Sequence, residues 1–97
     1  MERKINLINY INEIYHKLMN ETDGMEEIDI SELHMHKILF ILYGKFLSKF
    51  NIELFNANFL AWKYGPVEID YRNKKLEKFN NISLTSEQFN FLNFILK

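Results

Sequence analysis

The chain has 97 residues, 12 Lys and Arg against 13 Asp and Glu, and no cysteine. This length predicts a single domain over residues 1–97, and a hydrophobic fraction of 47% argues against disorder. The lack of cysteine excludes disulfides, thiolate metal sites and a cysteine nucleophile. The balanced charge disfavours nucleic acid as a partner, because proteins that bind it non-specifically carry a basic excess.

The sequence also predicts the cellular compartment. The opening MERKINLINY is charged and lacks the apolar stretch of a signal peptide. The chain has no apolar run of about 18 residues, the minimum for a membrane-spanning helix. We therefore expect a cytoplasmic protein that does not enter a membrane.

The first predicted element is an amphipathic helix over about residues 2–19. Its apolar residues recur at helical spacing, at Leu7, Ile11, Ile14 and Leu18. The following segment, NETDG, contains residues that end helices and form turns.

An acidic segment, ETDGMEEIDISE, follows the first helix. Its Asp-Gly pair invites comparison with an EF-hand calcium loop. Placing Gly24 at the sixth position puts Met19 first and Ile30 twelfth, and neither side chain offers an oxygen ligand. We interpret the segment as a solvated loop whose Asp29 or Ser31 caps the next helix.

The second predicted helix, residues 31–50, is apolar over most of its circumference. Such a helix needs neighbours on more than one side. We therefore expect it to be the central helix of a mainly α fold, a small bundle of about four helices.

The middle of the chain predicts little β structure, at most a short extended segment near residues 55–64. Gly65 precedes Pro66, and a residue before proline is pushed out of the helical region. We therefore expect helix and strand alike to stop at Gly65. A third helix is predicted from about residue 68 to 79.

The final predicted helix begins with a capping box of Thr85 and Gln88 and continues to Lys97. Its apolar residues point in nearly every direction around the axis. Two interpretations remain open. Either aromatic residues such as Phe91 and Phe94 contact a partner or a second copy of the chain, or the helix inserts centrally.

No catalytic constellation is recognisable, so the sequence predicts a protein that is not an enzyme and uses no cofactor. His34 and His36 are separated by about 200° around a helix and cannot ligate one metal together, so no metal site is expected. They are interpreted as exposed or packed histidines. Glu68 and Asp70 are interpreted as charges at a helix N-terminus. The basic segment over residues 72–78 is interpreted as a solvated helix face.

The chain resembles one family through two motif blocks, MHKILFILYG and AWKYGPV, and a Phe between them. The matching residues are Met35, Lys37, Ile38, Leu39, Phe40 and Gly44 in the first block, Phe55 in the middle, and Ala61, Trp62, Tyr64, Gly65, Pro66 and Val67 in the second. Over roughly residues 30–92 this pattern is similar to the SocA-like Panacea domain of phage and mobile-element proteins. His36 stands where that family usually has Gln.

The resemblance implies a mainly helical, non-enzymatic antitoxin domain that binds a protein toxin and neutralises it by direct contact. Its partner-binding residues would include Trp62, Tyr64, Gly65 and Pro66, with the glycine and proline forming a rigid turn that presents the two aromatic side chains. The alternative is that Trp62 and Tyr64 belong to the core, where a Trp in a small domain usually lies.

The sequence is also compatible with two other functions. The short length motivates a phage-encoded inhibitor of a host defence nuclease, comparable to an anti-CRISPR protein. The basic segment over residues 72–78 motivates a DNA-binding regulator.

Overall fold

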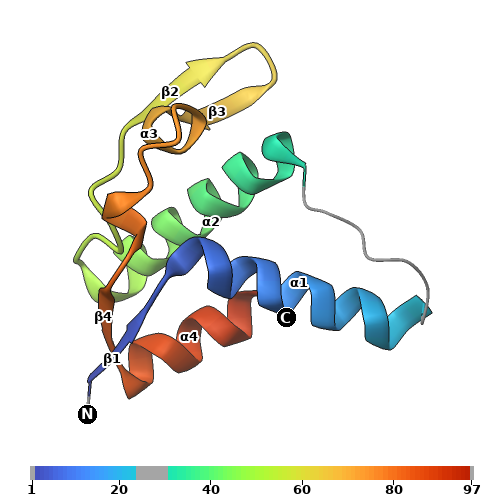
Figure 1. Cartoon of the computed structure of the whole chain (residues 1–97). Helices are drawn as coiled ribbons and strands as arrows, with labels where there is room; N and C mark the ends of the chain where they lie inside the picture. Colours follow the sequence, from blue (N-terminus) through green and yellow to red (C-terminus); the bar gives the residue numbers. More distant parts are fainter. Residues whose placement is uncertain (1, 24–30, 97) are drawn as a thin grey trace.

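The computed structural model of the chain describes residues 2–23 and 31–96, with side chains described for 2–17 and 31–96. Its elements follow in the order β1 (Glu2–Ile5), α1 (Leu7–Asp23), α2 (Glu32–Phe50), β2 (Phe59–Trp62), β3 (Gly65–Glu68), α3 (Ile69–Arg72), the 3-10 helix η1 (Glu77–Phe79), β4 (Ile82–Thr85) and α4 (Ser86–Leu96) (Figure 1). β1 pairs with β4, and β2 pairs with β3, both antiparallel.

The fold is therefore mixed α/β, and the prediction of a mainly α bundle with at most one short β segment is wrong. Four α-helices are present in the described residues, together with two antiparallel sheets of two strands each. The four strands are each only four residues long. Strands this short carry almost no periodic signal of their own, because their stability comes from the strand opposite.

The first helix starts later than predicted, because the chain begins with a strand. Glu2 lies opposite Thr85 at one end of the β1–β4 pair, and Ile5 lies opposite Ile82 at the other. Asn6 then caps α1, since its side-chain oxygen accepts a hydrogen bond from Asn9 N at 3.2 Å. Helix α1 continues to Asp23. The Leu18 side chain, Gly24 and the candidate cap Asp29 lie outside the described side chains.

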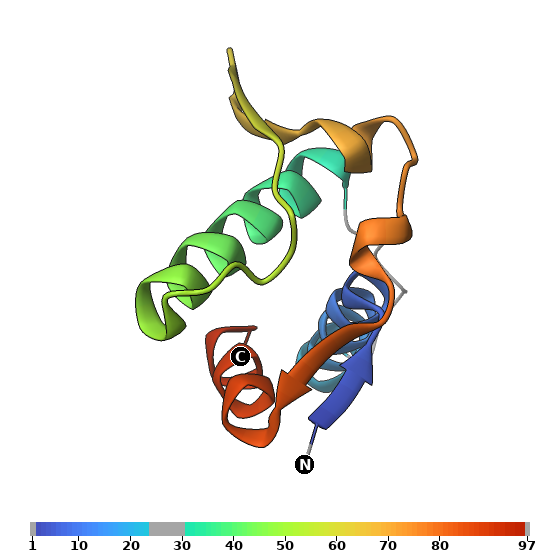
Figure 2. The same cartoon turned by 90° about the vertical axis from the view of Figure 1, so that its left-hand side faces the viewer.

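Helix α2 confirms the predicted second helix. Ser31 caps it by accepting a hydrogen bond from His34 N at 3.2 Å, and Asn51 ends it in the left-handed conformation with φ 58°. The helix crosses the molecule between the β2–β3 hairpin and α4 (Figure 2). It contributes the largest share of the buried core, namely Met35, His36, Ile38, Leu39, Leu42 and Phe46.

The predicted third helix over residues 68–79 is wrong. In its place the chain completes β3, makes the short helix α3, turns through Lys74 with φ 62° and forms η1. The left-handed residue stops a continuous helix, and the bonds of Glu68 described below hold this folded-back path.

Helix α4 confirms the predicted final helix and its capping box. Gln88 N donates to Thr85 Oγ1 at 3.1 Å, and Thr85 N donates to Gln88 Oε1 at 2.9 Å. Leu92 is fully buried, while Phe91 is partly buried and its ring packs on Phe50 with centroids 5.4 Å apart. The helix thus joins the core along one face only.

Candidate functional site

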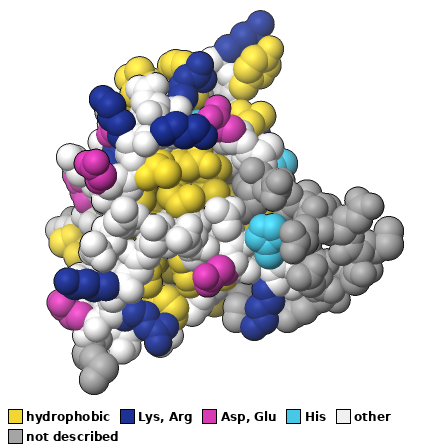
Figure 3. Space-filling view, viewed as in Figure 1, with side chains coloured by type: hydrophobic (Ala, Val, Ile, Leu, Met, Phe, Trp, Pro, Cys, Tyr) yellow, Lys and Arg dark blue, Asp and Glu magenta, His cyan; other side chains and the backbone are white. Residues whose placement is uncertain are grey.

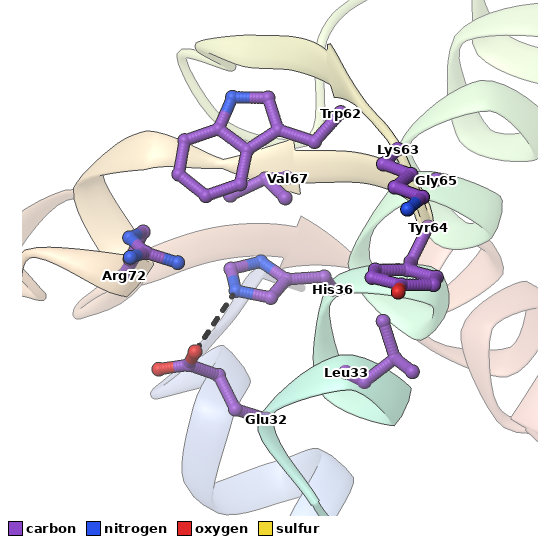
Figure 4. A pocket seen from close by; sticks show the side chains of 9 residues that line it. All are labelled: Glu32, Leu33, His36, Trp62, Lys63, Tyr64, Gly65, Val67 and Arg72. Atoms are coloured by element: carbon purple, nitrogen blue, oxygen red, sulfur yellow. Dashed lines mark ion pairs between the residues drawn. The ribbon is translucent and has the colours of Figure 1, made fainter.

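A pocket of about 300 Å³ lies between the start of α2, the β2–β3 hairpin and α3 (Figure 4). Ligand sites usually measure about 300–1,000 Å³, so this one suits a single side chain or a small molecule. Its lining comes from α2 (Glu32, Leu33 and His36), from the hairpin (Trp62 through Gly65, and Val67) and from α3 (Arg72).

The hairpin owes its shape to the Gly-Pro pair. Ile69 N donates to Asn58 O at 3.0 Å, and bonded and non-bonded pairs alternate along an antiparallel ladder. The pair Ala61–Pro66 is therefore a non-bonded pair, where the missing N–H of proline costs the hairpin nothing. Gly65 has φ 121°, a conformation that other residues rarely adopt. Strand β3 begins at Gly65, so the prediction that a strand must stop there is wrong.

A fully buried carboxylate, that of Glu68, anchors the base of the hairpin. One oxygen accepts hydrogen bonds from Asp70 N at 2.8 Å and Tyr71 N at 3.2 Å. The other accepts from Asn58 N at 2.8 Å and from Lys78 Nζ at 2.5 Å. Lys78 Nζ also lies 2.6 Å from the Asp70 carboxylate. Glu68 and Asp70 thus lie at the N-terminus of α3 as predicted, and the Glu68 side chain joins the residue before β2 to α3 and η1.

His36 connects this anchor to the pocket. Its side chain is buried, and its Nδ1 accepts a hydrogen bond from Glu68 N at 3.1 Å. Because Nδ1 is an acceptor, the neutral ring carries its proton on Nε2. Within the described residues Nε2 has no hydrogen-bond partner, and the Glu32 carboxylate lies 3.9 Å away, beyond hydrogen-bond distance. The site therefore contains a buried donor that is unused.

The protonation of His36 should make stability depend on pH. Burial lowers the pKa of His36 from its ordinary 6.5, Arg72 lowers it further, and the carboxylates of Glu32 and Glu68 oppose the shift. Because the unfolded chain then binds the proton more readily, the free energy of unfolding should fall as pH drops below about 6.5. Protonation would also place an N–H of the ring against the N–H of Glu68.

Urea unfolding of wild type, His36→Gln and His34→Gln between about pH 7.5 and 5.5 checks this expectation. The glutamine at position 36 still offers an oxygen to Glu68 N but does not titrate, so its stability should fall less with acid than that of wild type. His34 is exposed and serves as the matched control. Equal pH dependence in wild type and His36→Gln would contradict the assignment of this effect to His36.

The aromatic residues of the hairpin are exposed at the pocket. Trp62 is 44% exposed and Tyr64 is 72% exposed. The Arg72 guanidinium carbon lies 4.4 Å from the centroid of the Trp62 ring, a cation–π contact that holds both side chains beside the pocket. The alternative that Trp62 and Tyr64 belong to the core is therefore wrong.

The structure separates the predicted site residues into two places. Trp62, Tyr64 and Gly65 line the pocket, and Pro66 lies next to them in β3 without lining it. Phe91 and Phe94 lie on α4, outside the pocket. Phe94 is 80% exposed.

Sequence reasoning missed the polar residues of the pocket, His36, Arg72 and Glu32. His36 lies between buried Met35 and Ile38, and a histidine within an apolar helix is the signal that could have indicated it. The basic segment over residues 72–78 is not one solvated face as predicted, because Arg72 lines the pocket and Lys78 pairs with Glu68. The different roles of Arg72 and Lys78 follow from contacts with residues distant in the sequence.

The groups that line the pocket are the N–H donor of His36, the guanidinium of Arg72, the carboxylate of Glu32 and apolar walls, and together they can bind a ligand. Among the described side chains no group of three or more His, Cys, Asp and Glu is placed to hold a metal ion. None of the helices over residues 2–23 and 31–96 is both long and apolar enough to cross a membrane.

Comparison of the chain with family models, curated proteins and solved structures found no match. The likeness to the Panacea domain therefore rests on the motif residues alone.

Proposed function

We propose that the chain is a non-enzymatic, protein-binding antitoxin that acts in the cytoplasm and neutralises a cognate toxin by direct contact. The observation that carries the proposal is the exposure of Trp62 and Tyr64 on a hairpin whose base is anchored by Glu68. Large aromatic side chains held at fixed positions are typical of the residues that contribute most to protein interfaces.

The surface around the hairpin supports a protein partner. Leu60 in β2 is 49% exposed and Leu33 at the start of α2 is 45% exposed. Figure 3 shows hydrophobic and basic side chains side by side at the tip of the hairpin, and a further hydrophobic patch on the same face. Exposed apolar patches with polar rims mark interaction sites on small domains.

A protein partner is favoured over DNA by the use of the basic residues. Lys78 is engaged by Glu68 and Asp70. The basic segment therefore presents fewer free cations than its sequence suggests, and phosphate contacts depend on free cations.

The test combines co-expression with capture. Wild type should rescue growth from the toxic product of a neighbouring gene and should bind that product after purification. The double variant Trp62→Ala, Tyr64→Ala should lose rescue and should bind the toxin about 30-fold more weakly or worse, because truncation of an interface hot spot costs about 2 kcal/mol or more. Circular dichroism should show both proteins folded, since both side chains are exposed.

Phe94→Ala is the matched control, because it removes another exposed aromatic side chain, which lies on α4 outside the pocket. It should bind the toxin like wild type. Loss of binding in Phe94→Ala alone would move the interface to α4, and rescue by neither protein would contradict the antitoxin proposal. Capture of a defence nuclease in place of a toxin would support the inhibitor alternative.

A further inference from the structure

We infer that the pocket beside His36 binds a carboxylate joined to an apolar group about the size of one amino-acid side chain. The inference rests on the proposed function for the source of this carboxylate, which is a residue of the partner protein. The chemistry of the pocket itself is argued from its geometry.

The first observation is the unused donor on His36. The side chain is 3% exposed, its Nδ1 accepts a hydrogen bond from Glu68 N, and its Nε2 has no hydrogen-bond partner among the described residues. Buried side-chain donors nearly always have a partner, so this one points to an acceptor that arrives with a ligand. Figure 4 shows Nε2 pointing to the side of the pocket that holds Glu32 and Arg72.

The second observation is the charge beside that donor. Arg72 lines the pocket and forms no salt bridge with any of the described side chains. A guanidinium offers N–H donors in a planar arrangement that matches a carboxylate. Arg72 and His36 Nε2 together therefore favour a carboxylate over a neutral acceptor.

Glu32 occupies the approach to this corner in the free protein. Its carboxylate lies 3.9 Å from Nε2, too far to satisfy the donor, and its side chain is 50% exposed. A side chain with this much exposure is free to rotate into solvent. We expect the carboxylate of the ligand to take the place of the Glu32 carboxylate. Because the two groups carry the same charge, Glu32 should weaken binding of the ligand.

The third observation is the apolar wall on the other side of the pocket. In Figure 4, Leu33 and Tyr64 lie across from Arg72, and Trp62 covers the space between them. The ligand should therefore be amphipathic, with its acid end at His36 and Arg72 and its apolar end at Leu33 and Tyr64. A volume of about 300 Å³ limits the apolar end to one side chain.

The single tryptophan of the chain reports on this site directly, because Trp62 lines it. Titration of purified protein with N-acetylphenylalanine should change the Trp62 fluorescence and saturate with a Kd of about 1 mM, as expected for so small a ligand. N-acetylphenylalanine amide, which lacks the carboxylate, should bind about 10-fold more weakly. Equal binding of acid and amide, or no binding of either, would overturn the inference.

Two exposed charges allow variants that should stay folded. Arg72→Gln should weaken binding of the acid about 10-fold and should weaken binding of the amide less. Glu32→Gln should strengthen binding of the acid about threefold, because the substitution removes a negative charge beside the carboxylate of the ligand. Lys45→Gln, which removes an exposed charge that does not line the pocket, should leave both affinities at the wild-type value. If both Arg72→Gln and Glu32→Gln bind the acid with wild-type affinity, the inference is overturned.

A peptide pair separates the two sources of a protein carboxylate. N-acetylphenylalanine models a C-terminal residue, and N-acetyl-Phe-Glu-amide models an acidic side chain beside an apolar one. Tighter binding of either supports the inference and identifies the source. Loss of acid preference, with toxin binding still dependent on Trp62 and Tyr64, would overturn this inference while leaving the proposed function intact.

Discussion

Replacing Lys78 with methionine is expected to destabilise the protein by about 3 kcal/mol, because it leaves the buried Glu68 carboxylate without its cation. Glu68 is fully buried, and Lys78 Nζ lies 2.5 Å from its oxygen. Three backbone N–H groups still bind the carboxylate, which limits the loss to the lower part of the range for buried pairs. Urea unfolding followed by circular dichroism measures the effect.

A double-mutant cycle isolates the ion pair. Glu68→Gln alone should also destabilise, since its amide group cannot accept hydrogen bonds on both sides. The double variant Glu68→Gln, Lys78→Met should lose less free energy of unfolding than the sum of the two single losses, by about 1 kcal/mol or more. Lys75→Met, an exposed lysine three residues away, is the control and should change stability by less than about 0.5 kcal/mol. Additive losses in the cycle would show that the pair is not coupled.

Truncating Phe79 to alanine should cost about 3–5 kcal/mol, the range for large aromatic side chains removed from a core. Phe79 is fully buried in η1, with its ring centroid 5.1 Å from that of Phe55 and 6.3 Å from that of Tyr71. A domain of this size has a free energy of unfolding of about 5–15 kcal/mol, so the loss is a large part of the whole.

The same unfolding experiment supplies the control for Phe79. Phe94→Ala removes an identical side chain that is 80% exposed and should cost less than about 0.5 kcal/mol. Equal losses for the two variants would show that Phe79 does not act through burial. Because η1 carries both Phe79 and Lys78, loss of either should also weaken the support of the hairpin and hence of the pocket.

The signals that predicted structure correctly are local ones. Ser31 and the box of Thr85 and Gln88 cap helices through hydrogen bonds that span three residues, so a short window of sequence contains both partners. The apolar circumference of α2 likewise requires burial on several sides wherever the helix lies. These features made α2 and α4 predictable.

The parts that were missed depend on partners distant in the chain. Strand β1 exists because Glu2–Ile5 finds Ile82–Thr85 at the other end of the sequence. The helix expected over residues 68–79 does not form. Instead the Glu68 carboxylate accepts hydrogen bonds from Asp70 N, Tyr71 N and Lys78 Nζ, and these bonds hold the chain in a folded-back path. Local propensity is weak compared with such contacts.

The candidate site divides in the same way. The pattern AWKYGPV was enough to mark a turn with aromatic residues around it, since glycine and proline restrict the backbone wherever they occur. The exposure of Trp62 and the unused donor of His36 were decided by the tertiary structure. His36 reaches Glu68 across 32 residues, and burial and hydrogen-bond satisfaction belong to such assembled contacts, which no local pattern contains.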